Sequence, residues 1–169
     1  MIALGLNAGR DVLQTVGISE MKISRRKDEV LVTYSLGSCV ALSLYDPAIG
    51  AAGLIHCMLP QSSIDAEKAR RSPGMFVDLG VQALLDGMAA LGAARRSLVA
   101  KVAGGANVFD DRGMFRIGER NLATLRKILW KNDILIAAED VGGTKARTMY
   151  VSVATGRVLL RSGTQQVEL

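Results

Sequence analysis

Apolar and polar residues alternate with a period of two through much of the first third of the chain, which is typical of β-strands. Residues 12–24 alternate loosely, and a charged stretch then interrupts the pattern. Residues 30–35 are rich in β-branched and aromatic side chains, which favour a strand. The pattern therefore predicts a strand-rich N-terminal region.

The next two apolar segments are predicted to form a hairpin. Asp46-Pro47 opens a turn and Gly50 closes it, between the apolar runs 39–45 and 51–59. In the first run the alternation is regular and separates two sets of side chains, Val40, Leu42 and Leu44 on one face and Cys39, Ala41, Ser43 and Tyr45 on the other.

The length of the hairpin loop decides which side chains share a face. A four-residue loop over 47–50 places His56 opposite Ala41 and one diagonal step from Cys39, at about 7 to 8 Å between backbones. A loop one residue longer or shorter would move His56 to the other face and bring Cys57 opposite Cys39. The sequence permits a Cys39–His56 pair without requiring it.

Helical spacing appears in two places further along the chain. An apolar stripe with helical period predicts a first helix that ends at Gly92, and it comprises Phe76, Leu79, Ala83, Leu84, Met88 and Leu91. A second apolar set predicts a helix that ends near 131–132, and it comprises Leu122, Leu125, Ile128 and Leu129. The polar segment 61–74 and the segment 107–120 are predicted to be loops.

Further strands are predicted at 97–105, 133–140, 148–153 and 158–162, the last two as a terminal hairpin. The sequence contains no internal repeat and no interdomain linker, so residues 1–169 are predicted to form a single domain. The expected fold class is α+β, with many strands and two main helices packed outside them.

Composition narrows the function classes. The chain of 169 residues has a net charge of +5, and its basic residues fall in separate segments. Aromatic residues make up only 4% of the chain, which argues against a nucleic-acid surface built on stacked bases. Because it has no membrane-length apolar stretch and no signal-peptide pattern at the start, we expect a cytoplasmic protein without membrane insertion. Both cysteines are then expected to be free thiols.

Cys39 and His56 are the first candidates for chemistry. A histidine within hydrogen-bond reach of a cysteine is the usual means of generating a thiolate near neutral pH. The backbone amides of a tight 37–39 turn could also stabilise an oxyanion. The alternative is that both are ordinary core residues, because free cysteine is often buried as a small apolar side chain.

Metal and cofactor sites are not predicted. His56 and Cys57 are adjacent in a strand and point to opposite faces, and there is no CxxC pair or second histidine. The glycine-rich stretches 103–107 and 142–147 match neither nucleotide-binding pattern and are expected to be turns.

Six segments, taken in order, resemble the chemoreceptor glutamine deamidases of the CheD family. They are VTYSLGSCVALSLYDP, GLIHCMLP, KVAGGANVF, IGERN, AEDVGGT and ATGRV. The resemblance implies a layered α/β structure around a β-sandwich. It also implies a cysteine hydrolase that converts glutamine side chains of methyl-accepting chemotaxis receptors to glutamate and releases ammonia, without a cofactor.

The same resemblance implies roles for individual residues and partners. The family's nucleophile maps onto Cys39, its catalytic histidine onto His56 and the third member of its triad onto Thr33. Cys57 is then expected to be a core residue. Members of the family also bind a CheC-type phosphatase, so the alternative function is a non-catalytic chemotaxis adaptor that regulates such a phosphatase.

Overall fold

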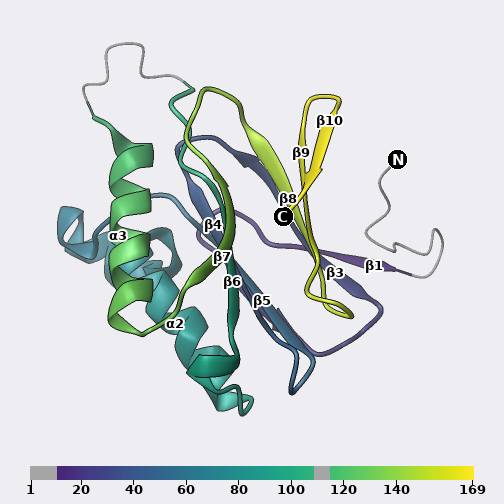
Figure 1. The fold of residues 1–169 in the computed structure, drawn as a ribbon. Coiled ribbons are helices and arrows are strands. Elements are labelled where there is room, and N and C mark those ends of the chain that lie inside the picture. The colour runs from purple at the N-terminus through teal and green to yellow at the C-terminus, as the bar shows by residue number, and fades with distance from the viewer. Residues whose placement is uncertain (1–10, 109–114) are drawn as a thin grey trace.

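The computed structural model describes residues 11–108 and 115–169, and the strands of these residues form two five-stranded sheets (Figure 1). The first sheet has the order β1 (Val12–Thr15), β3 (Glu29–Leu36), β8 (Arg147–Ser152), β9 (Val158–Ser162) and β10 (Gln165–Glu168). The second has the order β2 (Met21–Ser24), β5 (Ala51–Cys57), β4 (Val40–Asp46), β6 (Val99–Gly104) and β7 (Ile136–Val141). Both sheets are mixed, since β1 pairs with β3 and β6 with β7 in parallel while their other pairs are antiparallel.

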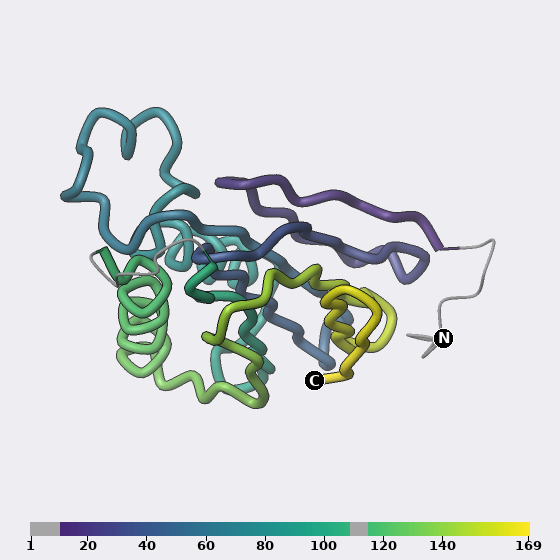
Figure 2. The backbone as a smooth tube through the Cα atoms, turned by 90° about the horizontal axis from the view of Figure 1, so that it is seen from above, coloured from purple at the N-terminus to yellow at the C-terminus, as the bar shows by residue number. Residues whose placement is uncertain are grey.

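The two sheets pack face to face, and helices cover the outer face of the second sheet (Figures 1 and 2). The main helices are α2 (Val77–Ala90) and α3 (Ile117–Lys131), and a shorter α1 (Ala66–Arg71) precedes them. Short 3-10 turns lie at Ser62–Ile64, Pro73–Met75 and Arg95–Ser97. The predicted fold class, a layered α+β structure around a β-sandwich with two main outer helices, is confirmed.

Each face of the second sheet contributes to a separate apolar cluster. Between the sheets, Leu31 and Met149 of the first sheet meet Ala41 and Leu54 of the second. On the helix side, Leu42 of the same sheet meets side chains of α2 and α3, among them Leu84, Met88, Leu125 and Leu129. Strands of the second sheet are therefore buried on both faces, and burial of each large apolar side chain contributes about 1.5 to 3 kcal/mol.

The predicted hairpin is confirmed, and of the two registers that the sequence left open it has the one of a four-residue loop. Asp46 pairs with Ala51 and Ala41 with His56, as a four-residue loop requires. The alternation of β4 is confirmed as well, because Val40, Leu42 and Leu44 lie in the helix-side cluster and Ala41, with the half-buried Cys39, lies in the cluster between the sheets.

Both predicted loops contain helices that the periodicity did not indicate. Within 61–74, residues 66–71 form α1, because Asp65 acts as its N-cap and accepts a hydrogen bond from the Lys68 N–H at 3.0 Å. Within 107–120, α3 begins at Ile117, after Arg116 with a φ of +46° and no capping side chain. A start without a capping side chain leaves no helix-start signal in the sequence, so the predicted loop was wrong at 117–120.

Two details of the remaining elements also differ from prediction. Leu79 and Leu91 of the predicted apolar stripe are exposed, and Val81 and Leu85 are buried in their place. The buried face of α2 is therefore rotated relative to the predicted one. The C-terminal strand β10 was not predicted, because Gln165, Gln166 and Glu168 give it no apolar alternation.

Candidate active site

Cys39 and His56 lie on the same face of the second sheet, the face toward the first sheet. His56 pairs with Ala41 across the β4–β5 ladder, and Cys39 lies two residues before Ala41 and packs against the same apolar cluster. Diagonal neighbours of this kind are about 7 to 8 Å apart between backbones and closer between side chains. His56 is 1% exposed, whereas Cys39, at the end of the 37–39 turn, is half-buried.

Thr33 on β3 of the opposite sheet reaches across the sandwich to His56. Its Oγ1 lies 2.7 Å from His56 Nδ1 and donates to the Val16 carbonyl oxygen, also at 2.7 Å. Because the single hydroxyl proton is used on Val16, Nδ1 must carry the proton of the ring and donate it to Oγ1. Nε2 of the neutral ring is then the nitrogen with a free lone pair.

Nε2 of His56 has no hydrogen-bond partner among the described residues, although it is buried. Burial also lowers the pKa of His56 to about 4, because removing water disfavours the charged imidazolium. At neutral pH the ring is therefore uncharged, and Nε2 is able to accept a proton.

The two cysteines have different surroundings. Burial raises the pKa of Cys39 above its ordinary value, and its own backbone N–H counteracts part of that rise by favouring the thiolate. Cys57 is 1% exposed and lies in the helix-side cluster, where burial raises its pKa further. The predicted core position of Cys57 is thus what the structure shows.

The backbone of the 37–39 turn is held by the glycine-rich segment that follows β6. The Gly37 carbonyl accepts from the Ala106 N–H and the Cys39 carbonyl from the Gly105 N–H, both at 2.8 Å. A side chain at Gly104, where φ is +104°, would place its Cβ 2.2 Å from the Cys39 carbonyl oxygen. This segment is therefore a turn in which glycine permits the chain to approach Cys39.

Two backbone donors of that turn remain available. Within the described residues, the N–H groups of Ser38 and Cys39 donate to no acceptor of another residue. Unpaired N–H groups beside a nucleophile are the arrangement that stabilises an oxyanion in acyl transfer. The turn thus has the donors that the sequence suggested for residues 37–39.

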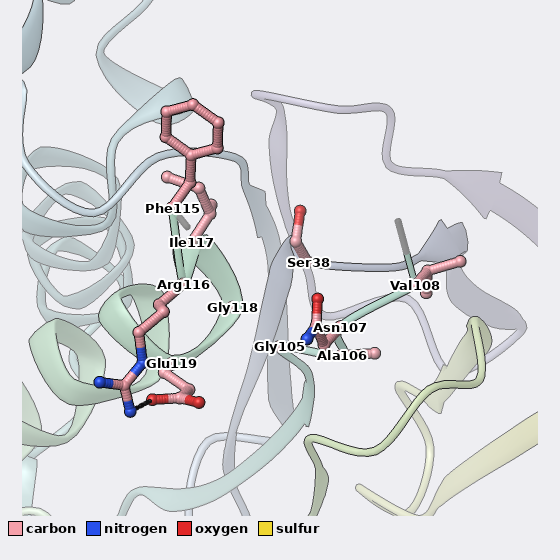
Figure 3. A pocket seen from close by; sticks show the side chains of 10 residues that line it. All are labelled: Ser38, Gly105, Ala106, Asn107, Val108, Phe115, Arg116, Ile117, Gly118 and Glu119. Carbon is pink, nitrogen blue, oxygen red and sulfur yellow. Dashed lines mark hydrogen bonds and ion pairs between the residues drawn. The ribbon is translucent and has the colours of Figure 1, made fainter. Parts of the chain in front are cut away.

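A cavity of about 350 Å³ opens beside Ser38 (Figure 3). Ser38 and Val108 lie on one side of it. Phe115, just before α3, and Ile117, the first residue of α3, lie on the other. Its size is at the lower end of the range for small-molecule pockets. Ser38, the residue directly before Cys39, lines the cavity, whereas Cys39 and His56 do not.

Two groups that contact this region were missed by the sequence analysis. One is the Val16 carbonyl, which left no signal because a main-chain atom acts there. The other is Asn121 of α3, which is 0% exposed and donates to the carbonyls of Ser38 and Met58. Asn121 directly precedes the apolar set of the predicted second helix, and its place in the IGERN segment of the family resemblance is the signal that could have identified it.

The fold and the site together define a class of protein, an α+β sandwich in which a thiol, a neutral imidazole and a hydroxyl share the space between the sheets. Among residues 11–108 and 115–169, no three histidine, cysteine or acidic side chains gather where they could hold a metal ion. In the same ranges, no helix is long and apolar enough to cross a membrane.

Comparisons with known proteins identify the family within this class. Residues 58–162 match the family model described as CheD chemotactic sensory transduction. A probable chemoreceptor glutamine deamidase CheD 1 from Syntrophus aciditrophicus is 46% identical over 147 residues, which is 87% of this chain and 92% of that protein. Probable chemoreceptor glutamine deamidases CheD from Solibacter usitatus (45% identical, 91% of each chain) and Archaeoglobus fulgidus (40% identical, 90% of this chain and 94% of that protein) are also similar. The chain belongs to the CheD family.

Proposed function

We propose that this protein is a protein-glutamine deamidase that converts glutamine side chains of methyl-accepting chemotaxis receptors to glutamate. Membership of the CheD family supports it, as do the relatives described as probable chemoreceptor glutamine deamidases. The observation that carries the mechanism is the hydrogen-bond chain from Val16 through Thr33 to His56 Nδ1, which leaves the buried Nε2 unpartnered on the face that holds Cys39.

The first half of the reaction forms a thioester. The Cys39 sulfur attacks the carboxamide carbon of the glutamine, and its proton passes to His56 Nε2. The negative charge that develops on the carboxamide oxygen is stabilised by the N–H groups of Ser38 and Cys39. The intermediate collapses when His56 returns the proton to the nitrogen, which leaves as ammonia.

The second half regenerates the enzyme. Water attacks the thioester carbon and gives a proton to His56 Nε2, and the bond to Cys39 then breaks. The thiolate takes the proton back from His56, and the product is the glutamate side chain. Thr33 contributes by holding the tautomer in which Nε2 accepts protons throughout the cycle.

Proton transfer is expected to accompany attack. In the free protein both groups are neutral, because burial raises the pKa of Cys39 and lowers the pKa of His56. Both pKa shifts disfavour a thiolate–imidazolium pair before the substrate binds. We therefore assign His56 the role of a general base that acts as the substrate binds.

The direct test is to incubate the protein with cytoplasmic fragments of chemoreceptors from the same organism and to map glutamine-to-glutamate conversion by peptide mass spectrometry. We expect conversion at particular glutamines, with one ammonia released for each. The matched control is His56→Gln, which fills similar volume but lacks the base. The proposal fails if wild type converts none of the receptor glutamines or if His56→Gln converts them at the wild-type rate.

We also propose that a CheC-type phosphatase is a binding partner. Because the proposed partners are this phosphatase and the cytoplasmic parts of chemoreceptors, we propose a cytoplasmic location. Both rest on the family to which the chain belongs. Binding can be separated from catalysis by titrating a CheC-type phosphatase with wild type and Cys39→Ala. Equal affinity of the two is expected, and absence of binding by wild type would contradict the partner proposal while leaving the deamidase proposal intact.

A further inference from the structure

Asn121 is a buried polar residue that bridges two segments carrying the site. Its side-chain nitrogen donates to the Ser38 carbonyl oxygen at 2.9 Å and to the Met58 carbonyl oxygen at 3.1 Å. Ser38 directly precedes Cys39, and Met58 lies two residues after His56. One side chain of α3 therefore links the turn that bears the thiol to the end of the strand that bears the imidazole.

The bond to the Ser38 carbonyl also orients an N–H group. The peptide unit between Ser38 and Cys39 is planar and trans, so its C=O and N–H point in opposite directions. Asn121 holds the C=O toward α3, and the Cys39 N–H must then point away from α3. That N–H is one of the two unpaired donors of the turn, and it lies close enough to the Cys39 sulfur to favour its thiolate.

The neighbouring carbonyls of the turn are held by backbone donors, and only this one depends on a side chain. Ala106 and Gly105 supply N–H groups to the carbonyls of Gly37 and Cys39. Rotation of the Ser38–Cys39 peptide would turn the carbonyl oxygen toward the substrate and the N–H away from it. Among the described residues, the Asn121 side chain is the group that donates to the Ser38 carbonyl.

The side-chain oxygen of Asn121 indicates that a contribution to stability alone does not explain why an asparagine stands at this position. Its Oδ1 is buried and has no hydrogen-bond partner among the described residues. A buried acceptor without a partner is destabilising, and such groups in folded proteins are rare enough to require an explanation. The asparagine side chain offsets this cost by donating two hydrogen bonds, one to each of two carbonyl oxygens.

We propose that Asn121 is a positioning residue for deamidation, which holds the Ser38–Cys39 peptide so that the Cys39 N–H faces the developing oxyanion. The inference rests on the proposed function. Asn121 touches neither substrate nor the reacting atoms and acts through the backbone beside Cys39.

The test compares wild type, Asn121→Ala, Asn121→Asp and Asn132→Ala in receptor deamidation. Asn132, also in the region of α3, donates its side-chain amide to the Ile128 carbonyl at 2.8 Å and is the matched control. We expect Asn121→Ala to lower kcat by about 10²-fold or more, the usual effect of losing an oxyanion donor, with little change in KM. Asn132→Ala should keep the wild-type kcat.

Alkylation of Cys39 by iodoacetamide distinguishes a positioning role of Asn121 from a merely structural one. Alkylation needs the thiol but no oxyanion donor, so its rate in Asn121→Ala should fall by far less than kcat. In Asn121→Asp a protonated carboxyl regains one donor, so its kcat relative to wild type should rise as the pH is lowered.

The outcomes separate this inference from the function on which it rests. If wild type shows no deamidation, the proposed function fails. If wild type is active and Asn121→Ala keeps its kcat, or loses kcat and Cys39 alkylation in proportion, the positioning role is overturned. The same follows if Asn121→Asp shows no relative gain at lower pH, a result that can be read even if Asn121→Ala does not fold.

Discussion

The two faces of the second sheet are built on different chemistry, although adjacent residues of one strand supply both. His56 of β5 points into the space between the sheets, where it meets a hydroxyl and lies on the Cys39 side. Cys57, the next residue, points toward the helices, where it meets side chains of α2 and other apolar groups. Among the buried side-chain nitrogen and oxygen atoms of this strand, His56 Nε2 on the inter-sheet face is the one without a hydrogen-bond partner within the described residues.

The difference shows how one strand can serve stability and chemistry at once. Close apolar packing on the helix side holds β5 in place, so the opposite face can carry a desolvated imidazole. The two thiols of the chain follow the same division, because Cys39 is half-buried beside free N–H groups and Cys57 is enclosed.

The largest effect on stability is expected from two glycine substitutions, one on each face of the second sheet. Gly104→Ala forces a side chain into a φ of +104° and a 2.2 Å approach to the Cys39 carbonyl, so the 37–39 turn must move. We expect the free energy of unfolding to fall by roughly 2 to 4 kcal/mol and kcat to fall by about 10²-fold or more.

Gly80→Ala is the matched change on the helix side, where the new Cβ would lie 2.7 Å from Ile55 Cδ1 and 3.0 Å from Cys57 Sγ. It should lower stability by about 1 to 3 kcal/mol through overpacking, with kcat retained in the folded fraction. Urea unfolding and receptor deamidation measure both quantities. A loss of kcat in Gly80→Ala as large as that in Gly104→Ala would contradict the division between the faces.

The next effect is the pH dependence of stability that His56 introduces. The pKa of His56 is about 4 in the folded protein and about 6.5 when unfolded, so the unfolded chain binds more protons between these values. The stability from the neutral buried ring is present above pH 6.5 and is lost as the pH falls toward 4. The loss over this window is on the order of 3 kcal/mol, at about 1.4 kcal/mol for each pKa unit.

Chemical unfolding of wild type and His56→Gln at pH 7, 6, 5 and 4 measures this contribution. The difference between the two proteins isolates the titration of His56 from that of the carboxylates, which both proteins share. A difference that stays constant from pH 7 to 4 would show that the ring is not held neutral in the folded state.

A smaller effect is expected at the hydroxyl that orients His56. Thr33→Val keeps the shape of the side chain but leaves Nδ1–H without an acceptor, so the tautomer with a free Nε2 loses its preference. We expect kcat to fall by about 10²-fold, within the range assigned to general-base catalysis. Thr33→Ser, which keeps the hydroxyl, should recover most of the activity, and equal kcat values for the two variants would remove Thr33 from the mechanism.

The smallest effect concerns the reactivity of the thiols in the free protein. Because burial raises the pKa of both, alkylation of Cys39 should be slow at pH 7 and accelerate with rising pH beyond the ordinary cysteine range. Cys57 should remain unlabelled in the folded protein. Peptide mapping after iodoacetamide treatment at several pH values gives both rates, and rapid labelling of Cys39 at neutral pH would indicate a standing thiolate instead.

Sequence periodicity reduced the strand register at the site to two alternatives that differ in the length of the hairpin loop. With a four-residue turn, the alternation in β4 places His56 opposite Ala41 and Cys57 on the opposite face, and the structure has that pairing. Period-two alternation is a local property, and a short loop transmits it from one strand to the next without any knowledge of tertiary packing.

Other parts of the site depend on contacts across the sandwich and were not predictable from local pattern. The interaction of Thr33 with His56 crosses from one sheet to the other, and its assignment came only from family resemblance. Asn121 lies between the predicted loop 107–120 and the first apolar residue of the predicted helix, and Val16 acts through its backbone. The expectation that His56 lowers the pKa of Cys39 also omitted burial, which determines the direction of the shift in the structure.

The central claim, that the inter-sheet face performs the reaction and the helix-side face supports it, is tested most directly by the two cysteines. The measurement is the rate of receptor glutamine deamidation by Cys39→Ala and Cys57→Ala, each confirmed to be folded, relative to wild type. We predict that Cys39→Ala loses activity by at least about four orders of magnitude and that Cys57→Ala retains the wild-type kcat. Activity that survives in Cys39→Ala, or that is lost in folded Cys57→Ala, would contradict the account.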